Sequence, residues 1–174
     1  MGYDSVFVSD VSFWIQTKRA RRIQQCLPFN WNDGWENVIL CVTTENQKRA
    51  DERLPILLDI PAKHKAFMIA PILSEVHVES YLATKQFEQV LCDGENYDGN
   101  RPCRYEWVKS LHDQCEKENV RFDFIGTGNV FVKDGKVYRI PKDIPKCTRQ
   151  SVLVCRIRSG ETDVPITAAM TKSS

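Results

Sequence analysis

Side chains that could bind a ligand stand directly after short apolar runs of this chain. Lysine and arginine at such positions can bind a phosphate or a carboxylate. Carboxylates there can ligate a cation or orient a substrate amine. The candidate ligand-binding residues are Lys18, Arg19, Glu45, Asn46, Asp93, Glu95 and Arg101.

Each candidate also has a purely structural interpretation. Asn46 precedes a predicted helix, where its side chain would serve as an N-cap, and Glu45 could join a local ion pair with Arg49. The carboxylates around Glu95 could form a loop ion pair with Arg101. Lys18 and Arg19 could equally be solvated residues at the start of a helix, and the pattern leaves these alternatives open.

Other chemical motifs are weaker. Gly126-Thr127-Gly128 has the composition of a phosphate loop, but an apolar run of β-forming residues follows it where a helix should begin, so a plain turn is expected. The histidines at 64, 77 and 112 are scattered, and the seven cysteines contain no Cys-x-x-Cys pair. We therefore expect reduced, mostly buried thiols, a cytoplasmic protein and no metal site in this chain.

The elements that must position the candidates alternate between strand-like and helix-like patterns. Val38–Val42 is a continuous β-branched and apolar run, which is typical of a strand buried on both faces. Strands are predicted at 6–8, 13–16, 38–42, 66–70, 89–92, 122–125 and 152–157, helices at 20–27, 46–60 with a kink or restart at Pro55, 78–83 and 102–119, and a β-hairpin at 130–140 around Asp134-Gly135.

This alternation predicts an α/β fold in which parallel strands are joined by right-handed crossovers. An open doubly wound sheet and part of a (β/α) barrel both fit, and both place functional groups at the carboxyl ends of the strands. A closed barrel needs eight repeats and about 250 residues, so a barrel formed by these 174 residues would be incomplete. Its free sheet edges would need a cover, either the terminal hairpin or a partner chain, which could be a second copy.

Composition limits the remaining possibilities. The net charge of +1 gives no bulk electrostatic attraction for nucleic acid, and 42% hydrophobic residues are ordinary for a globular protein. No apolar run is long enough to cross a bilayer. We expect one domain over residues 1–145, followed by a partly flexible extension over 146–174.

Several short motifs occur in a characteristic order along the chain. They are Gln16-Thr17-Lys18-Arg19, Trp35-Glu36-Asn37-Val38, Thr44-Glu45-Asn46-Gln47, Arg49–Pro55, Ala70–Leu73, Gly94-Glu95 with Arg101-Pro102-Cys103, Trp107-Val108, Gln114-Cys115 and Thr127-Gly128. In this order they resemble the phage gene-product 37/68 family of uncharacterised phage and bacterial proteins, and the similarity covers about Phe13–Pro141.

This resemblance implies a partial TIM-like barrel. Full-length members look like radical S-adenosylmethionine enzymes whose amino-terminal half carries the cysteines of an iron–sulfur cluster, and this chain resembles only the carboxyl-terminal half. The cluster and S-adenosylmethionine would then require a preceding segment that supplies the cysteines. The sequence departs from the family pattern at Ala70, Asp93 and Ile125-Gly126.

Two hypotheses follow. The first is a barrel half that is not catalytic alone, whose polar strand ends form the substrate-side wall. The second is a homo-oligomeric or partner-dependent module that binds a phosphorylated ligand or nucleic acid through Lys18, Arg19 and Arg101. A metal-dependent hydrolase using Asp93 and Glu95 is weaker, because no histidine lies near either residue in the sequence.

Overall fold

The computed structural model of the chain describes residues 11–97 and 101–140. The strands expected at 6–8 and 152–157, and the domain boundary expected near residue 145, lie outside these residues.

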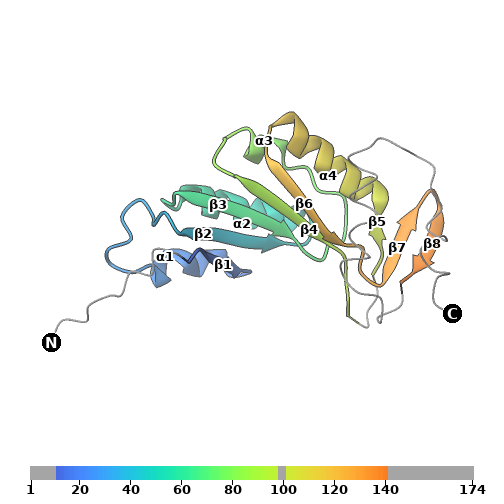
Figure 1. Cartoon of the computed structure of the whole chain (residues 1–174), viewed down its shortest axis with the longest axis horizontal. Helices are drawn as coiled ribbons and strands as arrows, with labels where there is room; N and C mark the ends of the chain where they lie inside the picture. Colours follow the sequence, from blue (N-terminus) through green and yellow to red (C-terminus); the bar gives the residue numbers. More distant parts are fainter. Residues whose placement is uncertain (1–10, 98–100, 141–174) are drawn as a thin grey trace.

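The centre of the fold is a five-stranded sheet in which every pair of neighbouring strands is parallel (Figure 1). Its strands follow one another in chain order, and β1 and β6 form the two edges, so the sheet is open. The prediction of parallel β/α repeats is confirmed, whereas a closed barrel is not formed by the described strands. The strands are β1 (Phe13–Thr17), β2 (Val38–Thr44), β3 (His64–Ile69), β4 (Gln89–Asp93) and β6 (Arg121–Gly126).

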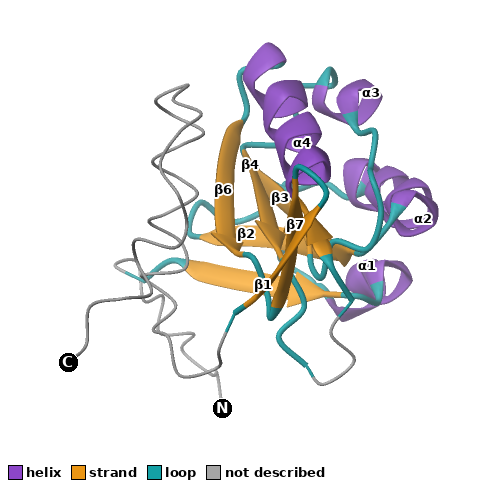
Figure 2. Cartoon of the chain, turned by 90° about the vertical axis from the view of Figure 1, so that its right-hand side faces the viewer, coloured by secondary structure: helices purple, strands orange, loops and turns teal. Residues whose placement is uncertain are grey.

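The helices of the described chain all lie on one side of this sheet (Figure 2). This arrangement follows from the topology: each connection leads to the next strand in the same direction, and crossovers of one hand then place their helices on one face. The helical segments are η1 (Ala20–Arg22), α1 (Ile23–Cys26), α2 (Gln47–Asp59), α3 (Glu79–Leu82) and α4 (Tyr105–Lys117).

A small second sheet lies beyond the carboxyl ends of the main strands (Figure 1). In it β5 (Cys103–Arg104) pairs parallel to β7 (Val130–Lys133), and β7 pairs antiparallel to β8 (Lys136–Arg139). Asp134 and Gly135 connect β7 to β8 with φ of 51° and 71°, as a tight two-residue hairpin turn requires. The predicted hairpin is confirmed.

Two predicted helix boundaries are wrong. Pro102 does not open a helix: Cys103 and Arg104 first pair with β7, and α4 begins at Tyr105, so pairing overrides the local signal. A restart of the helix at Pro55 is also wrong, because Pro55 lies inside a continuous α2.

The helix expected at 20–27 is confirmed as a helical segment, with a 3₁₀ turn over Ala20–Arg22 followed by a short α-helix over Ile23–Cys26.

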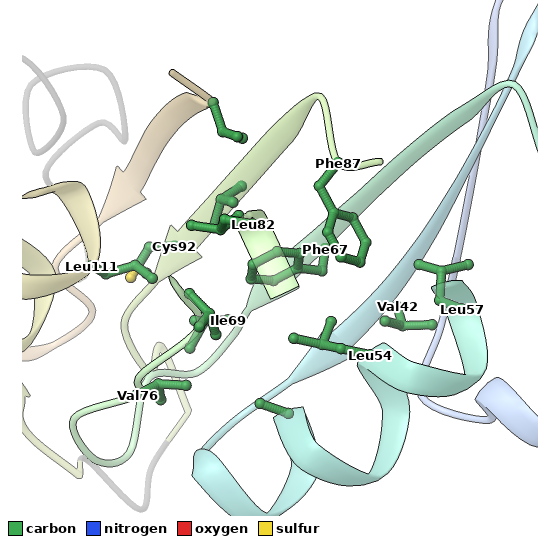
Figure 3. Close-up of a cluster of buried hydrophobic side chains, with 14 of the residues drawn as sticks. Val42, Leu54, Leu57, Phe67, Ile69, Val76, Leu82, Phe87, Cys92 and Leu111 are labelled. Atoms are coloured by element: carbon green, nitrogen blue, oxygen red, sulfur yellow. The ribbon is translucent and has the colours of Figure 1, made fainter. Parts of the chain in front are cut away.

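The core fills the space between the sheet and its helices (Figure 3). Leu54 and Leu57 of α2 are fully buried, as is Phe67 of β3, whose ring meets that of Phe87 edge-on at 4.9 Å between centroids. Because side chains alternate along a strand, the residues on either side of Phe67 in β3 point to the opposite face of the sheet. No helix covers that opposite face within the described residues.

Candidate functional site

Five charged side chains gather where the parallel strands end. We call this group the carboxyl rim, and it consists of Lys18, Glu45, Arg53, Glu95 and Arg101. Lys18 follows β1 and Glu45 follows β2, while Glu95 comes two residues after β4. Because parallel strands carry their carboxyl ends to the same edge of a sheet, residues distant in sequence meet there.

Glu45 joins two cations at the first part of the rim. One carboxylate oxygen contacts Lys18 Nζ, and the other lies 3.1 Å from Arg53 Nη1. Arg53 also donates to the carbonyl oxygen of Thr43, at the end of β2. The side chains of Glu45 and Arg53 are only 14% and 11% exposed, whereas that of Lys18 is 53% exposed.

Glu95 and Arg101 form the second part of the rim. Arg101 Nε lies 3.1 Å from both carboxylate oxygens, Nη2 contacts Oε1, and the backbone N–H donates to Oε2 at 2.8 Å. Glu95 is 6% exposed and Arg101 57% exposed. Hydrogen bonds from Arg101 lower the pKa of Glu95 despite its burial, and those to Glu95 raise the pKa of Arg101.

The two parts of the rim are connected through the segment that follows β3. Its backbone N–H groups bridge the neighbouring strand ends: Ile72 donates to the carbonyl of Asp93, and Leu73 donates to that of Glu45, both at 2.9 Å. The charge of Glu45 also contributes to the raised pKa of Arg101. The two parts of the rim are therefore joined through backbone hydrogen bonds.

Two backbone segments lock together behind Glu95, and we call this contact the glycine clasp, formed by residues 94–95 and 126–129. Gly94 N–H donates to the carbonyl of Gly126 at 2.8 Å, and Asn129 N–H donates to that of Glu95 at 2.9 Å. A Cβ on Gly94 would lie 2.2 Å from the carbonyl oxygen of Thr127. The Gly126-Thr127-Gly128 segment thus supports Glu95, which agrees with the prediction of a turn and not a phosphate loop.

Three predicted site residues have other surroundings. The side chain of Asn46 accepts the Arg49 N–H at 3.1 Å, so Asn46 is the N-cap of α2. Arg19 has an exposed side chain, and its backbone N–H donates to Thr17 Oγ1. Asp93 ends β4 and is half-buried.

The ion pair predicted between Glu45 and Arg49 is not formed. Arg49 pairs with Glu52 at 2.6 Å, one turn along α2, and Arg53 takes the position beside Glu45. Arg49 and Glu52 are three residues apart on one helix face, which favours their pairing.

Four residues at or beside the rim were not among the predicted site residues. Arg53 lies two turns into α2 and reaches back to the strand end. Gln16 donates to Thr43 Oγ1 at 2.9 Å and contacts Met68 Sδ at 3.2 Å, on the sheet face that the helices leave open. Strand alternation could have placed Gln16, Thr43 and Met68 on that face, because the residues on either side of each one along its strand point to the face that the helices cover.

The group with cation-binding geometry lies away from the rim, and the buried thiols are neutral. Within the described residues, one group with cation-binding geometry occurs: His112, Asp113 and Glu116 of α4, whose ligand atoms lie within 4.8 Å of one another. The His112 ring packs against Phe122, near the amino end of β6 and therefore opposite the rim. Burial raises the pKa of Cys41, Cys103 and Cys115 to about 12, so these side chains remain neutral thiols.

Comparison with known proteins gives one match. Residues 7–162 match the family model described as "Protein of unknown function (DUF5131)". The chain belongs to this family. No curated protein and no solved structure matches the DUF5131 chain. None of its described helices is long and apolar enough to cross a membrane.

The glycine clasp predicts a strong effect of a single methyl group. Gly94→Ala should lower the free energy of unfolding by about 2–3 kcal/mol, because the new Cβ meets backbone that cannot rotate away. Urea unfolding followed by circular dichroism measures the change.

Gly135→Ala is the matched control, since a Cβ there meets nothing within 4 Å although φ is 71°. It should lose only about 1 kcal/mol, from the left-handed backbone alone. Equal losses in the two variants would contradict the clasp.

The Glu95–Arg101 pair predicts a pH-dependent stability difference. Because the folded-state pKa of Glu95 lies below its ordinary value of 4.5, the pair stabilises the fold above that pH and loses its effect as the pH falls through the folded value. The stability of the wild type relative to Glu95→Gln should therefore be largest near neutral pH and shrink as the pH falls below 4.5. Urea unfolding of both proteins at matched pH values measures this difference, and a pH-independent difference would contradict it.

Proposed function

We propose that this DUF5131 chain is the ligand-binding half of a β/α-barrel protein and is not catalytic alone. The observation that supports this most is the winding of the sheet: five parallel strands in chain order, with all described helices on one face. In this proposal the carboxyl rim forms the wall that faces the ligand.

The winding favours a barrel over a doubly wound sheet. A doubly wound sheet reverses its strand order at a switch point and has helices on both faces. The described sheet has no such reversal. In a barrel the helices lie outside and the other face of the sheet points inward. The face that carries Gln16, Thr43 and Met68 would then be the inner wall, next to the rim.

The free edge of β1 supports the proposal that the barrel is incomplete. Phe13, Trp14 and Ile15 are 47%, 37% and 49% exposed, and β1 pairs with β2 on one side only. An apolar edge strand without a charge, a proline or a bulge is prone to pair with another strand. We propose that strands from outside the described sheet, in a second copy or another chain, continue it there.

The described cysteines do not fit an iron–sulfur cluster of the kind that the radical S-adenosylmethionine resemblance implies. Such clusters are bound by thiolates. Cys41, Cys92, Cys103 and Cys115 are all fully buried, and burial raises the pKa of each thiol. This supports a role in ligand binding and not in cofactor cleavage.

Anaerobic reconstitution with iron and sulfide tests the lack of a cluster. We expect no four-iron absorption spectrum from this chain alone, because its sequence lacks the closely spaced cysteines that bind such a cluster. A stable four-iron spectrum that survives desalting would contradict the proposal.

If the β1 edge pairs with a second copy of the chain, the chain should self-associate. A charge placed on β1 should weaken this association. Ile15→Lys places an ammonium on the free edge strand, a substitution that natural proteins use to block pairing. Sedimentation velocity over a concentration series should show association of the wild type that is at least about tenfold weaker in the variant.

Val137→Lys is the control, because Val137 is also exposed (61%) but lies on β8 of the small sheet. It should associate like the wild type. A wild-type chain that stays monomeric and whose β1 amides are protected from hydrogen exchange would show that the edge is already covered.

A further inference from the structure

The Lys18–Glu45 and Arg101–Glu95 pairs have the same asymmetry, in which a poorly exposed carboxylate pairs with a cation that reaches the surface. Glu45 is 14% exposed against 53% for Lys18, and Glu95 is 6% exposed against 57% for Arg101. Arg53, the second partner of Glu45, is only 11% exposed. Burying a carboxylate is unfavourable unless hydrogen bonds compensate for the lost water. In return, a buried carboxylate restricts the orientation of the cation that it holds.

The two exposed cations retain donors for a further partner. Arg101 uses Nε and one terminal nitrogen on Glu95, out of the five N–H groups of a guanidinium. Lys18 contacts Glu45 and has three N–H groups. Oxyanions are the groups that such donors bind most strongly.

The carboxylates that hold the two cations follow strand ends on the same edge of the sheet. Glu45 follows β2 and Glu95 follows β4, and β3 lies between these strands. Since neighbouring strands are about 4.8 Å apart, the ends of β2 and β4 are about 10 Å apart. Lys18 contacts Glu45 and Arg101 contacts Glu95, so each cation lies beside one of these carboxylates.

We propose that the carboxyl rim binds the oxyanion of a small ligand, a carboxylate or a phosphate, through Lys18 and Arg101. Glu45 and Glu95 are positioning residues that hold these cations and do not touch the ligand. The inference rests on the proposed function in that the rim faces the ligand. It separates the predicted site residues into two contacting cations and two supporting carboxylates, and it leaves Arg19, Asn46 and Asp93 outside the site.

The first experiment measures anion binding to the whole chain, with inorganic phosphate and succinate as separate probes. Side-chain ¹⁵N NMR of the Arg101 Nε–H group should show a saturable shift with at least one of them. Lys18→Gln and Arg101→Lys should each weaken binding at least about tenfold, as expected when a charge-assisted contact is lost, with unchanged circular dichroism.

Lys109→Gln is the matched control. Lys109 is 54% exposed and pairs with Asp113 on α4, so it resembles Lys18 in exposure and pairing but lies outside the rim. This variant should bind both probes like the wild type. No saturable binding of either probe, or equal weakening in Lys109→Gln, would overturn the proposal.

Glu95→Gln separates positioning from simple attraction. Removing a negative charge next to Arg101 should strengthen anion binding if only the net charge matters. If Glu95 orients the guanidinium, the same variant should weaken binding and shift the Nε–H resonance in the absence of ligand. Stronger binding in Glu95→Gln would overturn the positioning role.

A single-stranded oligonucleotide identifies the source of the anion. Oligonucleotide binding that falls steeply with salt and is not competed by phosphate or succinate would assign the cations to nucleic acid and overturn a small-ligand site. The outcome is separable from the barrel proposal. If Ile15→Lys weakens self-association but no anion binds, the rim proposal fails while the incomplete barrel stands.

Discussion

Parallel pairing of consecutive strands is the constraint on which the rest of this structure depends. It places every strand end on one edge and every described helix on one face. Residues that are far apart in the sequence, such as Lys18 and Glu45, therefore meet without any long loop. The same constraint leaves the other face and the β1 edge uncovered by described elements.

Ion pairs and backbone packing stabilise different parts of the rim. The carboxylate of Glu45 pairs with cations from two other segments, so these ion pairs connect the end of β2 to Lys18 after β1 and to Arg53 of α2. The pair of Glu95 and Arg101 instead closes the loop that follows β4. Close backbone contacts hold the segments themselves, most tightly where Gly94 meets Thr127. Charge pairing thus sets the direction of the side chains, while the glycines set the position of the backbone that carries them.

The sequence was sufficient to predict the five strands of the main sheet, because continuous apolar runs such as Val38–Val42 identify buried parallel strands independently of their partners. It also predicted that polar residues at strand ends would come together. The N-cap role of Asn46 followed from its place before an amphipathic helix, and the structure confirms that role.

The sequence did not predict contacts that depend on which segments become neighbours in the fold. Arg53 is eight residues from Glu45, and only the packing of α2 on the sheet shows that it reaches the carboxylate in place of Arg49. Cys103 and Arg104 pair with β7, almost thirty residues later, so no local pattern could show that the helix begins after them. The two tight approaches of the glycine clasp depend in the same way on which turns become neighbours.

The open hairpin turn offers practical access to the interior of this protein. Ile140 N–H donates to the carbonyl of Asn129, and Asn129 N–H donates to that of Glu95, so a chain of backbone contacts runs from the hairpin to the buried carboxylate. At Gly135 an added side chain meets no neighbouring atom within 4 Å. A spectroscopic label attached there would sit outside all packing and still sense rearrangement of the segment that carries Glu95.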